Sequence, residues 1–296
     1  MEKFRGKSVC LGLDVDPNLI PPILKSGDDG KAIDKFLFEI IQSVKDVAGI
    51  VKPNLGFYLK YGSMGISCLE KLMNDTLYNS GLLSILDAKF GDVENSSKAY
   101  SSAAYQRFHA DAVTINPYIG LDGLEDFIKG EKRSAFVLCK TSNKDSGEFQ
   151  NRPTIVSPAE DPELFDQLMR DQGHPVIPMY LYVAYRVKYC WNEKDNCGLV
   201  VGANHLGELS DVRKTVGPEM SILSPAIGAQ TDSKEQTLKN TIWAGGGKNT
   251  IINLGRSTLY SKDKDFAEGT RKSLIKNKSL VIQFQEEYHE KFAQQS

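Results

Sequence analysis

Three charged side chains stand close together in the segment Asp87-Ala-Lys-Phe-Gly-Asp92. Asp87 and Lys89 follow the apolar run of residues 83–86, and the period of two along a strand puts both side chains on one face. Unlike charges at the end of a buried strand are costly unless they are paired or used. A strand-end ion pair with a helix cap at Asp92 is the structural alternative. A cation between two anions, with a glycine that lets the backbone bend, favours chemistry.

Polar side chains also follow several of the other apolar runs. They are Asp14, Lys52, Asn54, Asn116, Thr141, Ser142 and Arg256. A helix cap at Asp14 and a lysine that snorkels from a strand end at Lys52 are the structural alternatives. Because these residue types recur at the same place in successive runs, we expect them to meet in one site.

Two later segments have the composition of a phosphate site. Gly255-Arg256 ends the last apolar run, and Gln230 stands in the polar segment after the preceding run. Glycine lets a phosphate approach the backbone, and arginine can donate to two phosphate oxygens. A turn glycine with a surface arginine is the structural alternative. Beside the charges of residues 87–92, the pattern favours the binding of one phosphate group.

Eight strand-like runs alternate with helical segments along the 296 residues. The runs are residues 9–13, 50–51, 83–86, 112–115, 134–138, 199–201, 220–223 and 250–254. The helical segments are residues 32–47, 65–78, 95–108, 122–129, 162–172, 179–191, 205–216, 235–244 and 257 onward. The alternation predicts an α/β protein with one domain over residues 1–296, a (β/α)8 TIM barrel. A doubly wound sheet is the alternative, but no GxGxxG follows the first run.

In such a barrel the carboxyl ends of the strands form the face that carries active sites. All the polar side chains named above follow strand-like runs, so they should gather at that face. A long polar stretch, residues 143–158, is predicted to be a lid or a disordered loop.

Composition excludes several classes of partner. Lys plus Arg (36) nearly balance Asp plus Glu (38), which argues against nucleic-acid and membrane partners. The five cysteines form no CxxC pair, so we expect a reducing compartment and no disulfide framework. No signal-like segment and no run near the ~18 apolar residues of a membrane span is found. We therefore expect a cytoplasmic protein, and the scattered histidines predict no metal site.

The ordered set of motifs resembles orotidine 5′-monophosphate decarboxylase. The set comprises Lys52, Asp87-x-Lys89-x-x-Asp92, Pro225-x-x-x-x-Gln230 and Gly255-Arg256, and the similarity runs over residues 11–260. The resemblance implies conversion of orotidine 5′-monophosphate to uridine 5′-monophosphate and CO2 in de novo pyrimidine biosynthesis. It also implies that neither a metal nor an organic cofactor takes part.

The resemblance further implies roles for individual residues. Lys52, Asp87, Lys89 and Asp92 would be catalytic, with Lys89 as the proton donor to C6 of the pyrimidine. The substrate would be bound by Asp14, Asn54, Val93, Ser96, Thr141, Ser142, Pro225, Gln230, Gly255 and Arg256. The working unit would be a homodimer in which Asp92, Val93 and Ser96 complete the site of the partner subunit.

Three other functions remain as alternatives. A metal-dependent sugar-phosphate decarboxylase or aldolase barrel of the same superfamily would hold magnesium on acidic residues. A Schiff-base aldolase would use Lys52 or Lys89 as nucleophile, although flanking carboxylates favour a charged and poorly nucleophilic Lys89. A catalytically silent barrel would only bind a nucleotide. The sequence leaves open whether the chain stands alone or belongs to a bifunctional UMP synthase.

Overall fold

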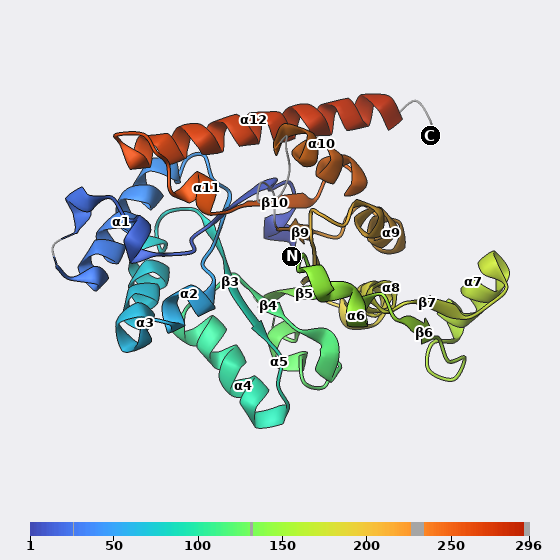
Figure 1. Cartoon of the computed structure of the whole chain (residues 1–296). Helices are drawn as coiled ribbons and strands as arrows, with labels where there is room; N and C mark the ends of the chain where they lie inside the picture. The colour runs from blue at the N-terminus through green and yellow to red at the C-terminus, as the bar shows by residue number, and fades with distance from the viewer. Residues whose placement is uncertain (26, 131–132, 226–233, 293–296) are drawn as a thin grey trace.

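A closed barrel of parallel strands forms the centre of the computed structural model, which describes residues 1–25, 27–130, 133–225 and 234–292 (Figure 1). Around the barrel the strands follow the order β1-β10-β9-β8-β5-β4-β3-β2. They are β1 (Val9–Gly12), β2 (Ile50–Lys52), β3 (Leu83–Phe90), β4 (Ala112–Ile115), β5 (Ser134–Lys140), β8 (Cys197–Val201), β9 (Ile222–Ser224) and β10 (Thr250–Leu254). This is the TIM barrel that the alternation of strand-like and helical segments predicts, and that prediction is confirmed.

Helices surround the barrel (Figure 1). They include α1 (Asp29–Val44), α2 (Leu55–Leu59), α3 (Gly62–Lys71), α4 (Glu94–Ser102), α5 (Glu125–Ile128), α8 (Met179–Tyr185), α9 (Leu206–Val216), α10 (Lys234–Ala244), α11 (Arg256–Leu259) and α12 (Phe266–Phe292). In α1 the apolar residues at the 3-4-7 spacing are all buried, and Asp28 caps the helix by accepting from the N–H of Lys31. The long helix α12 packs on α1 and α10.

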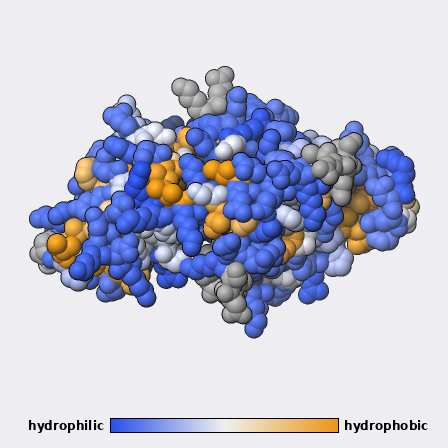
Figure 2. All heavy atoms as spheres, turned by 90° about the horizontal axis from the view of Figure 1, so that it is seen from above, coloured by the Kyte–Doolittle hydropathy of each residue, from blue (hydrophilic) through white to orange (hydrophobic). Residues whose placement is uncertain are grey.

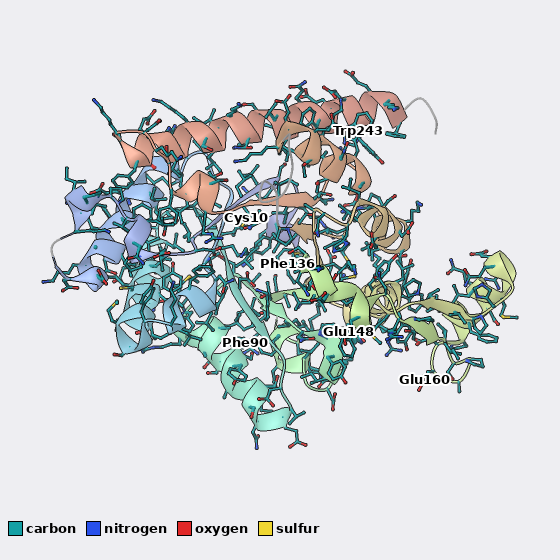
Figure 3. The ribbon with its side chains drawn as sticks, viewed as in Figure 1. Cys10, Phe90, Phe136, Glu148, Glu160 and Trp243 are labelled. Atoms are coloured by element: carbon teal, nitrogen blue, oxygen red, sulfur yellow. The ribbon has the colours of Figure 1, made fainter. Side chains whose placement is uncertain are left out.

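The barrel interior is filled by apolar side chains from alternate strand positions. Cys10 and Phe136 belong to this interior cluster and lie at the centre of Figure 3. The N-terminal 3-10 helix η1 (Glu2–Phe4) adds the fully buried Phe4, whose ring meets Phe136 edge to face at 5.5 Å. Gly198 leaves room for this pair, since a Cβ there would stand 2.8 Å from the Phe136 ring. The segment before β1 thus plugs the barrel end opposite to the one at which the strands finish.

Residues 143–158 were predicted to be a lid or a disordered loop, and the disordered alternative was wrong. The segment contains α6 (Gly147–Gln150) and β6 (Pro153–Ile155), which pairs antiparallel with β7 (Val176–Pro178). With α7 (Pro162–Gln172), this pair projects from the barrel (Figure 1). Local composition could not reveal the strand because its pairing partner comes some twenty residues later.

One buried carboxylate ties this projection to the barrel. Asp161 directly precedes α7. Its carboxylate accepts hydrogen bonds of 2.6 Å from Tyr182, which lies in α8, and from Arg186, which directly follows α8. A buried charge is tolerated when it is paired and hydrogen-bonded in this way.

The surface seen in Figure 2 is mostly hydrophilic, with apolar residues dispersed among polar ones. In the described part of the chain, no helix is both long and apolar enough to cross a membrane. All five cysteines are free thiols.

Candidate active site

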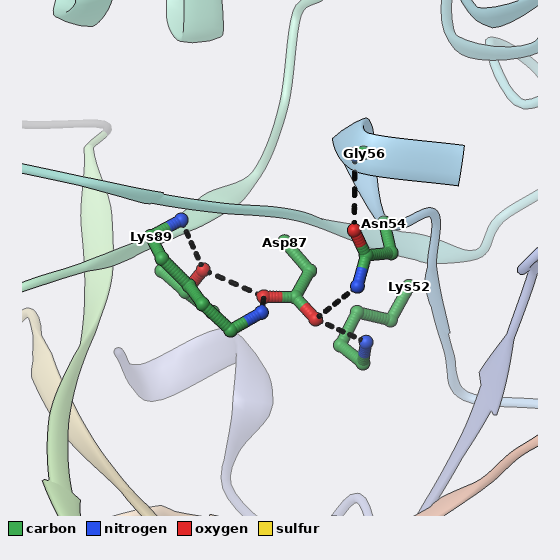
Figure 4. A network of polar contacts seen from close by, with 6 residues as sticks. Lys52, Asn54, Gly56, Asp87 and Lys89 are labelled. Carbon is green, nitrogen blue, oxygen red and sulfur yellow. Dashed lines mark hydrogen bonds and ion pairs between the residues drawn. The ribbon is translucent and has the colours of Figure 1, made fainter. Parts of the chain in front are cut away.

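The carboxylate of Asp87 is the centre of a polar cluster at the barrel mouth (Figure 4). One oxygen lies 2.6 Å from the Lys52 ammonium and the other 2.6 Å from the Lys89 ammonium. Thr114 donates to the second oxygen at 2.9 Å, and the Asn54 amide lies 3.4 Å from the first. The structure therefore brings together four of the residues that the sequence places in the site, from β2, β3 and the turn after β2.

The backbone holds these groups in register. Asn54 and Asp87 form a parallel bridge beyond the end of β2, and the N–H of Asp87 donates to Pro53 at 2.9 Å. The side-chain Oδ1 of Asn54 accepts from the N–H of Gly56 at 3.0 Å and so caps α2. The Asn54 side chain therefore has two functions: its Nδ2 lies beside Asp87, and its Oδ1 caps the N-terminus of α2.

Lys89 has an unusual backbone conformation. Strand β3 continues to Phe90, beyond the run of residues 83–86 expected from the sequence, and its pairing with β4 is irregular between Leu86 and Phe90. Within this stretch Lys89 has a φ of +53°, which is strained for a residue with a side chain. Its N–H donates to the hydroxyl of Thr114 at 2.9 Å. Strain of this kind is concentrated at functional sites.

The two lysines differ sharply in exposure. The Lys52 side chain is 5% exposed, whereas that of Lys89 is 47% exposed. Lys52 is therefore a buried counter-ion, and Lys89 is the ammonium group that a ligand or solvent can reach.

The charges of Asp87 and Lys52 shift each other's pKa. Burial alone would raise the pKa of Asp87, but the ammonium groups of Lys52 and Lys89 outweigh it and hold this pKa well below its usual range. Burial would lower the pKa of Lys52, but the carboxylates of Asp87 and Asp14 raise it above its usual value. Asp87 and Lys52 are thus both charged at neutral pH.

Asp14 follows β1 at the same mouth. Its Oδ1 atom is buried and has no hydrogen-bond partner within the described residues. Burial raises the pKa of this carboxyl, and the Lys52 ammonium opposes the rise. An unpartnered buried oxygen requires an explanation, and at the barrel mouth it is able to accept a hydrogen bond from a ligand hydroxyl.

Asp92 stands apart from the cluster. Its carboxylate accepts from the N–H of Val93 at 2.8 Å, and it forms no ion pair with Lys52 or Lys89 in the described ranges. Val93 and Ser96 are both exposed, just before and within the first turn of α4. Within one chain the array is one anion between two cations, rather than the cation between two anions that the sequence suggests.

The remaining predicted residues lie on the loops that follow other strands. Thr141 and Ser142 are half-buried directly after β5, and Pro225 directly follows β9. Gly255 precedes α11, whose first residue is the exposed Arg256. Gln230 lies outside the described residues.

Sequence reasoning missed residues that position the site. Thr114 contacts both Asp87 and Lys89, yet it stands inside an apolar run. The alternation of side chains along β4 places Thr114 on the inner face of the barrel, next to Asp87 on the neighbouring strand β3. The sequence therefore contained enough information to predict this contact. Tyr260 accepts from the N–H of Asp16 at 2.6 Å and donates to the carbonyl of Asp14 at 3.2 Å, and no local pattern predicts that contact.

In the described ranges, no group of three or more His, Cys, Asp or Glu side chains is arranged to hold a metal ion.

Comparisons with known proteins agree with this geometry. Residues 7–268 match the family described as orotidine 5′-phosphate decarboxylase / HUMPS. The chain is 37% identical to an orotidine 5′-phosphate decarboxylase of Roseiflexus castenholzii over 270 residues, which cover 90% of each chain. It is 34% identical to that of Herpetosiphon aurantiacus, covering 92% of this chain and 94% of the relative.

Solved structures give the same result. The fold resembles Leishmania donovani OMP decarboxylase with a TM-score of 0.71 and 26% identity, covering 95% of this chain and 96% of the other. It also resembles Leishmania donovani UMP synthase, with a TM-score of 0.73 and 28% identity, covering 95% of this chain and 55% of the other. With a family match over most of its length and full-length relatives above 30% identity, this chain belongs to the orotidine 5′-phosphate decarboxylase family.

Proposed function

We propose that Lys89 supplies the proton when this chain converts orotidine 5′-monophosphate to uridine 5′-monophosphate and CO2. The chain is a carboxy-lyase of pyrimidine biosynthesis. The observation that carries the assignment of Lys89 is the contrast between the two ammonium groups on Asp87. Lys52 is buried, while Lys89 is held at 2.6 Å by the same carboxylate and remains open to a ligand.

The reaction breaks the bond between C6 and the carboxylate and leaves an electron pair on C6. A positioned ammonium group can stabilise that charge and then donate its proton to C6. Lys89 meets both needs, because Asp87 fixes the direction of its Nζ atom. The neutral amine left behind regains a proton from solvent, which its exposed side chain can reach.

Asp87 has a second role in the proposal. Its carboxylate stays ionised between the two lysines. The substrate carboxylate would approach it there. Two carboxylates ~4 Å apart at an effective dielectric of ~20 repel by about 4 kcal/mol. The repulsion vanishes as CO2 leaves, so it lowers the barrier relative to the bound substrate. Lys52 keeps Asp87 charged and in place.

Other residues of the mouth would bind the substrate. The unpartnered oxygen of Asp14 suits a ribose hydroxyl. Asn54, whose amide lies 3.4 Å from Asp87, would also contact the substrate. Thr141 and Ser142 would hold the pyrimidine edge. The phosphate would be bound by the residues after β9 and β10, which are Pro225, Gln230, Gly255 and Arg256. These loops are where barrels of this type commonly hold phosphate.

A homodimer completes the proposal, with Asp92, Val93 and Ser96 entering the site of the partner subunit. Large apolar side chains are exposed after three successive strands: Val93 is 59% exposed, Tyr118 84% and Phe149 63%. Tyr118 and Phe149 line one groove of about 970 Å³. Exposed apolar side chains on the loops after neighbouring strands suit a protein interface. A single domain and a cytoplasmic location stay predictions.

The proposal is tested by following the ultraviolet absorbance of orotidine 5′-monophosphate in the presence of a chelator. We expect wild-type turnover to persist, and Lys89→Ala to lose at least about 10³-fold in kcat, the scale of a catalytic acid and a charge-stabilising donor. Lys60→Ala is the matched control. It also removes an ammonium group, but the Lys60 ammonium lies over the rings of Phe57 and Tyr61 and not beside Asp87. It should keep wild-type kcat.

Three outcomes would contradict this assignment. Loss of wild-type activity in chelator would favour the metal-dependent barrel. Borohydride trapping of the substrate on Lys52 or Lys89 would favour the Schiff-base aldolase. Normal turnover by Lys89→Ala would remove the proton donor from the mechanism.

A further inference from the structure

A second lysine is fully buried at the barrel mouth, outside the catalytic cluster. Lys140 ends β5 and is 1% exposed. The pairing of β5 with β8 is irregular between Leu138 and Lys140, and Lys140 lies opposite Val201, which belongs to the outer core between strands and helices. The irregularity therefore turns Lys140 away from the barrel interior. Burying an ammonium group is costly, so its contacts require an explanation.

The contacts of Lys140 form a chain to another loop. Its Nζ donates to the hydroxyl of Ser146 at 3.0 Å, and that hydroxyl lies 3.4 Å from Nε2 of His205. His205 in turn has its Nδ1 3.4 Å from Glu208 in α9. Burial lowers the pKa of Lys140 below its usual value, and the Glu208 carboxylate partly opposes this. The chain runs from the end of β5 to the start of the helix after β8.

The segment closed by the Lys140–Ser146 bond contains Thr141 and Ser142. The N–H of Thr141 donates to Gln150 at 2.8 Å, and the Gln150 amide donates back to the Thr141 hydroxyl at 2.8 Å. That hydroxyl gives its own hydrogen to Asn143 at 2.6 Å. Its hydrogen is therefore committed, and it can offer only an acceptor to a ligand.

The loop after β8 fixes the position of Ser142. The side-chain amide of Asn204 donates to the backbone carbonyl of Ser142 at 3.1 Å, and the N–H of Gly202 donates to the backbone carbonyl of Lys140 at 2.8 Å. A Cβ at Gly202 would stand 2.9 Å from Ser142, so the two loops are in close contact. The conformation of residues 141–142 is thus fixed by protein groups alone.

We propose that Lys140, acting through Ser146 and His205, is a positioning residue for the ring end of the substrate. The proposal rests on the proposed function, in which Thr141 and Ser142 hold the pyrimidine. It adds that a buried ammonium group helps to hold the segment that carries them before substrate arrives, which reduces the ordering cost of binding. Loss of Lys140 should therefore weaken recognition of the ring and leave recognition of the ribose and phosphate intact.

The experiment compares two ligands by calorimetry. UMP carries the ring, and ribose 5-phosphate lacks it. We expect Lys140→Met to weaken UMP binding and to raise KM for orotidine 5′-monophosphate by about tenfold, the scale of one charge-assisted hydrogen bond. Ribose 5-phosphate affinity should be unchanged. Ser146→Ala, which leaves the charge in place, should shift UMP in the same direction by a smaller factor and serves where Lys140→Met does not fold.

Lys278→Met is the control. Lys278 lies on α12, away from the mouth, and its Nζ donates to the carbonyl of Val47 at 2.8 Å. It should change neither affinity. Equal losses for both ligands, or UMP affinity unchanged in both test variants, would overturn the positioning role. A wild type that neither turns over orotidine 5′-monophosphate nor binds UMP would instead overturn the proposed function and this role with it.

Discussion

Asp87 is the residue on which the geometry of the mouth depends. Its two oxygens are used by two ammonium groups, and Thr114 adds a hydrogen bond to one of them. The same hydroxyl of Thr114 accepts from the N–H of Lys89. One threonine therefore orients both the carboxylate and the strained backbone of Lys89, the proposed proton donor. Such paired support is what keeps a catalytic side chain in one rotamer.

Because the pKa of Asp87 is depressed in the folded protein, its ion pairs should stabilise the fold at neutral pH and lose that contribution in acid. A group whose folded pKa is lowered contributes stability above its unfolded pKa, about 3.9 for Asp. That contribution is lost as the pH falls through the lower, folded value. We expect the urea midpoint of the wild type to fall more steeply below about pH 4 than that of the Lys52→Met/Asp87→Leu double variant.

The matching control is a partly exposed ion pair, Lys71 with Asp34, whose atoms lie 2.8 Å apart and whose side chains are 56% and 22% exposed. Solvent screens a pair of that kind. The Lys71→Met/Asp34→Leu variant should keep the wild-type slope in acid. If the Lys52/Asp87 double variant showed that slope too, Asp87 would not be ionised to unusually low pH.

At the scale of elements, the two ends of the barrel serve different purposes. The end at which the strands begin is filled by η1, whose Phe4 is completely buried against Phe136. The end at which they finish carries the charged cluster. Residues at the first end are expected to affect stability, and those at the second to affect chemistry.

Truncation of the plug tests this division. Phe4→Ala should lower the free energy of unfolding by about 3–5 kcal/mol, the usual cost of removing a buried phenyl ring. Phe38→Ala on α1, where the ring is 52% exposed, is the control and should cost much less. Both variants should keep the wild-type KM at 25 °C. A large change of KM in Phe4→Ala would show that the plug also shapes the mouth.

The elements also show what the sequence could predict. Periodicity located the barrel strands and α1, because each buries a regular apolar face against the same core. It also placed Asp87 and Lys89 near Lys52, since parallel strands end at one face. It could not supply β6, whose partner is distant, nor the irregular pairing around Lys140, which depends on two strands at once. The bond from Tyr260 to the carbonyl of Asp14 joins residues 246 positions apart, which no local pattern can predict.

For the whole molecule, the position of Asp92 is informative. It lies beyond the cluster in its own chain and is followed by the exposed Val93. Oligomers with two-fold symmetry place the same patch of each subunit against the other. In the proposed dimer, each site would therefore receive Asp92 from one subunit and Lys89 from the other.

Subunit complementation tests this arrangement. Lys89→Ala and Asp92→Asn should each be inactive alone. When the two are co-expressed, half of the dimers are mixed, and one of the two sites in each mixed dimer has both residues intact. About a quarter of wild-type activity should then return. Co-expression of two differently tagged Lys89→Ala chains is the control and should stay inactive. Mixed dimers isolated by their two tags that remain inactive would place Asp92 in the site of its own chain, and the proposed exchange between subunits would be wrong.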